Sequence, residues 1–146
     1  MNDAAHVPAR LGAYYFAYFT YAGALVPYFS LWLAAQGYGA AQIALVLAMP
    51  QVARVFPPSL WGCLAAHSGR RREIVVFGAF AVFAGFAALY SVRGAAGVAL
   101  VMLVLSVLAA GAMPLVEAAT LAATQGQAGR YGPIRLWGSI GFILAV

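Results

Sequence analysis

Two charged side chains fall inside long apolar runs of this sequence. Arg54 lies in the middle of one run, and Glu117 lies near the end of another. If these runs cross a membrane, a charge at a helix centre costs about 2.5 to 3.5 kcal/mol and persists only beside a partner or a wet cavity. We therefore predict that both residues bind substrate or protons. The structural alternatives are an arginine bound to carbonyls that nearby prolines leave free, and a glutamate in a structural ion pair.

Arg135 is the natural partner of Glu117. It opens the apolar run that follows the one containing Glu117, so a short connection would make the two helices antiparallel neighbours. A carboxylate beside a guanidinium changes protonation with what else is bound, as proton-coupled transport requires. We predict that Glu117 is the protonatable and binding group, Arg135 its partner and a substrate clamp, and Arg54 an anion contact at the membrane midplane.

The first apolar run carries a stripe of amphipathic rings. At about 100° per residue, the rings fall on one helix face within about 80°. Such rings can stack on a sugar or an aromatic substrate while donating a hydrogen bond. Tyr21 and Tyr28 lie deepest and are predicted to line a cavity; the alternative is helix packing with an interfacial belt. The whole stripe is Tyr14, Tyr18, Tyr21, Tyr28 and Trp32.

The composition indicates that these residues sit on membrane helices. Apolar residues make up 65% of the chain and charged residues only 8%, whereas a soluble domain carries about 25% charged residues. Lipid must therefore be most of the solvent around this chain. The net charge of +5 does not indicate nucleic-acid binding, because the arginines lie mostly between apolar runs.

Five apolar runs predict an all-α, polytopic membrane helix bundle. Prolines in the second run are expected to bend it. The last run would rise about 18 Å, short of a hydrocarbon core of about 30 Å. We therefore expect a fragment, with four full transmembrane helices and a truncated fifth. The runs are residues 11–35, 43–66, 74–92, 97–121 and 135–146.

The distribution of arginine predicts the orientation. With a cytoplasmic N-terminus, six arginines fall on the cytoplasmic side and only Arg93 falls outside, which is the bias of the positive-inside rule. We expect a multi-pass protein of the bacterial inner membrane. The cytoplasmic arginines would be Arg10, Arg70, Arg71, Arg72, Arg130 and Arg135.

The turn after the second run resembles the cytoplasmic signature between helices two and three of the major facilitator superfamily. The acidic position of that signature is Ala66 here, so the charge latch of the family is absent. The resemblance implies that the basic turn anchors the cytoplasmic face and shapes gating. The matching residues are Gly62, Gly69, Arg70, Arg71 and Arg72.

Two later segments, Pro114–Glu117 and Tyr131–Phe142, are similar to the branch with the phenylpropionate permease, the lactose permease and the nucleoside–proton symporters. In both permeases an acid on helix four and an arginine opening helix five have the spacing of Glu117 and Arg135. In the lactose permease that pair binds the sugar, so the resemblance implies a binding role. Phe142 stands where that permease has a sugar-stacking tryptophan, and it is a cavity-lining candidate.

The opening residues 15–33, with Val52–Arg54, are most similar to the phenylpropionate permease group. We predict a proton-coupled symporter of a small organic solute, most readily an aromatic carboxylate such as 3-phenylpropionate, because arginine pairs a carboxylate bidentately. A sugar or nucleoside symporter of the same fold is the alternative. A membrane-embedded enzyme would need convergent catalytic groups, and a non-transporting scaffold would have no reason to bear buried charges.

The resemblance implies about twelve helices in two six-helix halves that rock around a central site, and residues 1–146 would be an incomplete N-terminal half. The expected partners are the small-molecule substrate, protons and the lipid bilayer. We expect the proton gradient to take the place of a cofactor, no metal, and function as a monomer when the protein is full length.

Overall fold

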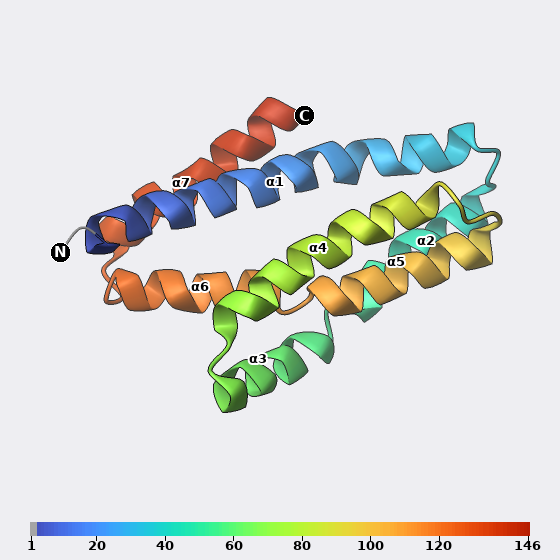
Figure 1. Ribbon diagram of the computed structural model, residues 1–146. Helices are drawn as coiled ribbons and strands as arrows, with labels where there is room; N and C mark the ends of the chain where they lie inside the picture. Colours follow the sequence, from blue (N-terminus) through green and yellow to red (C-terminus); the bar gives the residue numbers. More distant parts are fainter. Residues whose placement is uncertain (1–2) are drawn as a thin grey trace. The chain divides into compact units, whose positions relative to one another are not determined.

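Every regular element that the computed structural model describes, in residues 3–146, is an α-helix (Figure 1). Side chains are described from residue 7. The predicted all-α fold is thereby confirmed for this part of the chain. The helices fall into two compact units, one containing the chain up to Trp32 with Glu117–Val146, the other Leu33–Val116. Each unit is described by itself below.

The first unit contains most of α1 (Asp3–Ala35), the end of α6 (Ala112–Ala123) and α7 (Ala128–Ala145). Helices α1 and α7 approach closely because glycines remove side chains where they meet. A Cβ built on Gly138 would lie 2.7 Å from the Phe19 ring, and one on Gly141 would collide with the carbonyl oxygen of Phe16. Small residues permit this close packing of membrane helices.

The second unit contains α2 (Ala40–Val52), α3 (Pro57–Ser68), α4 (Arg71–Leu89), α5 (Ala95–Ala109) and the first residues of α6. Helix α5 packs against both α2 and α4, and α3 packs against α4. The buried apolar side chains of α5 supply much of this packing. They are Val98, Ala99, Met102 and Leu105.

The second predicted run is two helices, because it breaks between Val52 and Pro57. A proline has no N–H to donate and its ring clashes with the carbonyl four residues earlier, while its own fixed φ suits the first turn of a new helix. Pro57 and Pro58 accordingly begin α3, and Phe56 precedes them with φ −105°. The prediction of one bent helix over residues 43–66 is corrected to two helices with a turn.

The fourth predicted run is also divided, between α5 and α6. Pro114 has no N–H and its ring clashes with the carbonyl four residues earlier, at Ala110, and the helix is interrupted at Ala110 and Gly111. Gly111 faces Trp61, whose ring lies 2.7 Å from where a Cβ would stand. The last helix starts earlier than predicted, at Ala128 rather than Arg135.

Three helical segments of the described chain are long and apolar enough to cross a membrane. They match the second, third and fourth predicted runs and support an integral membrane protein. The 33-residue α1 is long enough but is not among the three. Its tyrosines, glycines and prolines lower its mean hydropathy. The three segments are Ala40–Ser68, Arg71–Leu89 and Ala95–Ala123.

Candidate functional site

Glu117 is held by a tyrosine. The hydroxyl of Tyr131 donates a hydrogen bond of 2.9 Å to Oε1 of Glu117, and both side chains are partly buried. A short turn makes this contact possible by reversing the chain between α6 and α7. Gln125 and Gly126 have positive φ angles of 53° and 69° there. Hydrogen bonds to a charged acceptor are among the stronger ones in proteins.

Arg135 lies against two aromatic rings of α1. Its guanidinium carbon is 5.1 Å from the ring centre of Tyr15 and 4.8 Å from that of Phe19. The two rings are stacked, with centres 6.5 Å apart and planes 18° from parallel. Such cation–π contacts contribute about 0.5 to 2 kcal/mol each, depending on how far water is excluded. The rings therefore fix the position of the guanidinium without neutralising its charge.

The predicted direct contact between Glu117 and Arg135 is not formed. Within the described residues, neither an ion pair nor a hydrogen bond joins them. Tyr131 explains the difference. It lies four residues before Arg135 on the same face of α7, and its hydroxyl donates a hydrogen bond to the carboxylate of Glu117. Glu117 and Arg135 thus belong to one group of side chains in the first unit, with a phenol engaging the acid.

Tyr15 is a member of this group that the sequence did not single out. Its side chain is completely buried, and its hydroxyl has no hydrogen-bond partner among the residues that the structure describes. An unsatisfied buried polar group costs about 1 to 3 kcal/mol. The predicted stripe of rings lies on the helix face that carries Tyr14 and Tyr18, and this face does not include Tyr15. The usable signal was the spacing of Tyr15 and Phe19, which places two rings one turn apart.

Successive tyrosine rings of the stripe contact one another along α1. Tyr14 stacks on Tyr18 at 6.1 Å, and Tyr18 meets Tyr21 edge-on at 6.4 Å. Tyr21 is partly buried. Tyr28 is half exposed and donates a hydrogen bond of 2.9 Å to the backbone oxygen of Val146. The contacts are compatible with the packing role that the sequence left open.

Phe142 lies on α7 where α1 approaches it. A Cβ built on Gly23 of α1 would stand 2.8 Å from the backbone oxygen of Phe142. The Phe142 side chain is 38% exposed, so its ring is not enclosed by this packing. Five residues earlier on α7, Trp137 contacts the ring of Phe16 edge-on, with ring centres 6.4 Å apart. A shallow cavity beside this contact is lined by Ala9, Ala13, Phe16 and Trp137.

Arg54 belongs to the second unit and lies in the turn between α2 and α3. Its side chain is exposed, and its Nη1 donates a hydrogen bond of 3.0 Å to Oε1 of Gln51. The predicted position within a continuous helix is therefore wrong, because the break before Pro57 intervenes. A charge at a helix break has more freedom to reach an anion than one fixed in a helix interior.

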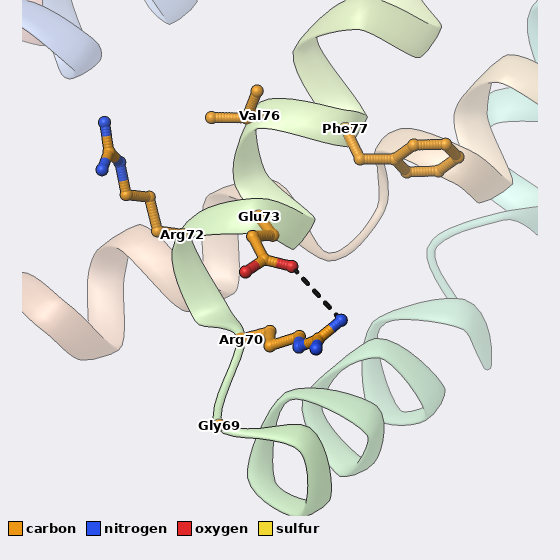
Figure 2. A pocket seen from close by; sticks show the side chains of 6 residues that line it. All are labelled: Gly69, Arg70, Arg72, Glu73, Val76 and Phe77. Atoms are coloured by element: carbon orange, nitrogen blue, oxygen red, sulfur yellow. Dashed lines mark ion pairs between the residues drawn. The ribbon is translucent and has the colours of Figure 1, made fainter.

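The basic turn joins α3 to α4 in the second unit. Gly69 ends α3 with φ 69°, a conformation that glycine adopts readily, and its N–H binds the carbonyl oxygen of Ala65 at 3.1 Å. Arg70 pairs with Glu73 at 3.7 Å, whereas Arg72 extends away from that pair (Figure 2). Both paired side chains are about 70% exposed, so the pair contributes about 0 to 1 kcal/mol.

The remaining signature residues are also accessible. Arg71 opens α4 and is exposed, and Gly62 on α3 has open space where a side chain would stand. A shallow cavity beside the turn is lined by Gly69, Arg70, Arg72, Glu73, Val76 and Phe77 (Figure 2). Its basic residues could meet acidic groups of other segments or of lipids.

The described helices include three segments apolar enough to cross a membrane, and Glu117 and Arg135 lie on the consecutive helices α6 and α7. Residues 9–146 match the MFS_1 like family. The chain therefore belongs to this family, and with it to the major facilitator superfamily.

Two curated relatives align along nearly the whole chain. A maltose permease of Geobacillus stearothermophilus is 32% identical over 134 residues, which cover 91% of this chain and 34% of the permease. The uncharacterized transporter YwbF of Bacillus subtilis (strain 168) is 28% identical over 142 residues, covering 97% of this chain and 35% of YwbF. The chain thus spans about a third of the length of these relatives. No solved structure matches it.

Proposed function

We propose that these residues are part of a proton-coupled symporter for a small organic solute, with an aromatic carboxylate such as 3-phenylpropionate as the substrate. The proposal rests on the side chains that surround the guanidinium of Arg135. Its guanidinium is held by two rings, while the nearby acid is engaged by Tyr131. An arginine fixed in this way can pair a substrate carboxylate bidentately.

Glu117 would couple the uptake of a proton to the binding of the substrate carboxylate by Arg135. As a carboxylate, it accepts the hydrogen bond from Tyr131 and competes with an anionic substrate for the charge of Arg135. When Glu117 takes up a proton, that competition ends and the guanidinium is left to the substrate. Proton and anion would then favour each other's binding, which is the reciprocal coupling that symport requires.

The aromatic part of the substrate would stack on the rings near Arg135. Tyr15 and Phe19 already form a stacked pair, and Phe142 lies further along α7 with part of its ring exposed. Offset stacking of aromatic rings contributes about 0.5 to 1.5 kcal/mol beyond the area buried. Arg54 is proposed as an anion contact within its own unit, and the turn at Arg70–Arg72 would take part in gating on the cytoplasmic side.

A sugar is the second candidate substrate. The likeness to a maltose permease favours it, and the tyrosines of α1 offer rings with hydroxyls that suit a sugar face. A nucleoside would use the same rings. In either case the full-length protein would work as a monomer in the bacterial inner membrane, with a cytoplasmic N-terminus. Its helices would rock around a central site.

The test is uptake by the full-length protein in proteoliposomes with an imposed inward proton gradient. We expect labelled 3-phenylpropionate to accumulate, a protonophore to abolish the accumulation, and unlabelled aromatic acids to compete. Competition by maltose, lactose or uridine with no effect of aromatic acids would replace the carboxylate with a neutral substrate. Accumulation that ignores the protonophore would contradict proton coupling.

A further inference from the structure

We infer that the hydroxyl of Tyr15 is a binding group for the substrate carboxylate, acting beside the guanidinium of Arg135. The inference rests on the proposed function and adds a specificity-determining residue to the same site. It starts from a polar atom whose burial the fold does not explain.

The Tyr15 hydroxyl is fully enclosed and lacks a hydrogen-bond partner in the described part of the chain. Buried polar atoms in native proteins nearly always have a partner, so an exception calls for a reason. Phenylalanine would fill the same space and stack on Phe19 equally well. The Tyr15 hydroxyl is therefore expected to bind a group from outside the described chain.

The surroundings of Tyr15 select the chemistry of that ligand. Arg135 lies over its ring at 5.1 Å and makes no hydrogen bond or ion pair with any described residue. A guanidinium offers up to about five N–H donors and no acceptor, while an ionised carboxylate only accepts. The neighbouring phenol of Tyr131 already donates to Glu117. The phenol of Tyr15 and the guanidinium thus remain as donors for an oxyanion.

A buried hydroxyl is reached only when the helices around it separate. Alternating access provides this movement, because the helices that line a transporter's site part on one side and close on the other. Arg135 is only partly buried, so a ligand can reach its guanidinium while α1 and α7 stay together. The contact with Tyr15 would form as the site closes around the substrate.

The test compares Tyr15→Phe with wild type in the purified full-length protein, by equilibrium binding of 3-phenylpropionate and of its neutral amide. We expect about a tenfold loss of affinity for the acid and less than a twofold change for the amide, because a hydrogen bond to a charged acceptor is stronger than one to a neutral acceptor. Tyr90→Phe is the control, since it removes a hydroxyl from a 90% exposed side chain of the other unit and is expected to leave both affinities unchanged.

Two further measurements separate binding from structure. The thermal midpoint of Tyr15→Phe is expected to stay level or rise, because an unpartnered hydroxyl is lost. Replacement of Tyr15 by para-aminophenylalanine restores a donor and is expected to restore selectivity for the acid. If wild type binds the acid and Tyr15→Phe binds it equally well, or loses acid and amide alike, the inference is overturned while the proposed function stands. A wild type that binds only neutral solutes overturns the proposed carboxylate substrate.

Discussion

The hydrogen bond from Tyr131 to Glu117 yields the sharpest prediction of this structure. Replacing Tyr131 with phenylalanine removes only the hydroxyl that lies 2.9 Å from Oε1 of Glu117. The carboxylate then loses its partner and is released to approach Arg135, four residues along α7 from position 131. A substrate carboxylate must displace it before it can bind the guanidinium.

The size of the effect follows from the strength of the lost bond. Hydrogen bonds to charged groups contribute about 1.5 to 3 kcal/mol, and both partners here are only partly buried, so the lower end applies. A change of about 1.4 kcal/mol is tenfold in affinity. We therefore expect Tyr131→Phe to weaken binding of an aromatic carboxylate about tenfold and to leave binding of a neutral analogue within a factor of about two.

The assay is equilibrium binding to purified full-length protein, carried out as a double-mutant cycle with Glu117→Gln. In the Glu117→Gln background no carboxylate is present to compete for Arg135, so adding Tyr131→Phe is expected to have little effect. Tyr90→Phe is a suitable control, because Tyr90 is 90% exposed and lies in the other unit. A tenfold loss that persists with Glu117→Gln would refute the reasoning, as would unchanged binding by Tyr131→Phe alone.

Three other predictions concern coupling and stability. Glu117→Gln is expected to abolish proton-driven accumulation while retaining exchange of substrate across the membrane; accumulation at the wild-type level would exclude Glu117 as the coupling group. Gly141→Ala is expected to destabilise the protein by about 1 to 3 kcal/mol through overpacking against Phe16, measured as a lower thermal midpoint in detergent. Gly132→Ala, with open space around it, is the control and is expected to be neutral or stabilising. Arg70→Ala is expected to change stability by less than about 1 kcal/mol, because the Arg70–Glu73 pair is exposed; a larger loss would indicate a buried role for this turn.

The fold class followed from the sequence because its signal is distributed over many residues. Few charges and long apolar runs indicate membrane helices whatever their detailed packing. The prolines also indicated the position of a bend in the second run. They could not indicate that the bend is a complete break, since a proline in a membrane helix is compatible with either outcome.

The candidate site was harder to predict because it depends on pairwise distances. The spacing of Glu117 and Arg135 indicated neighbouring helices, and both side chains do lie in one unit. The sequence did not predict that Tyr131 would bind Glu117 in place of Arg135. That contact requires α7 to begin at Ala128, in a stretch whose polar residues indicated a loop. Tyr15 was missed for a different reason: its spacing to Phe19 indicates two rings one turn apart, but the burial of its hydroxyl without a partner has no signature in sequence. The binding roles of Glu117, Arg135 and Arg54 remain predictions.

The absence of side chains at Gly138 and Gly141 has a mechanical consequence. With the Phe16 carbonyl directly against α7, a shift of either helix along the other would drive a Cβ into main-chain atoms, so sliding is blocked. We expect α1 and α7 to travel as one rigid pair throughout the transport cycle. The distances within the group formed by Tyr15, Phe19 and Arg135 would then be preserved in inward- and outward-facing states. Release of substrate would come from the departure of other helices, with the binding geometry itself left intact for the next cycle.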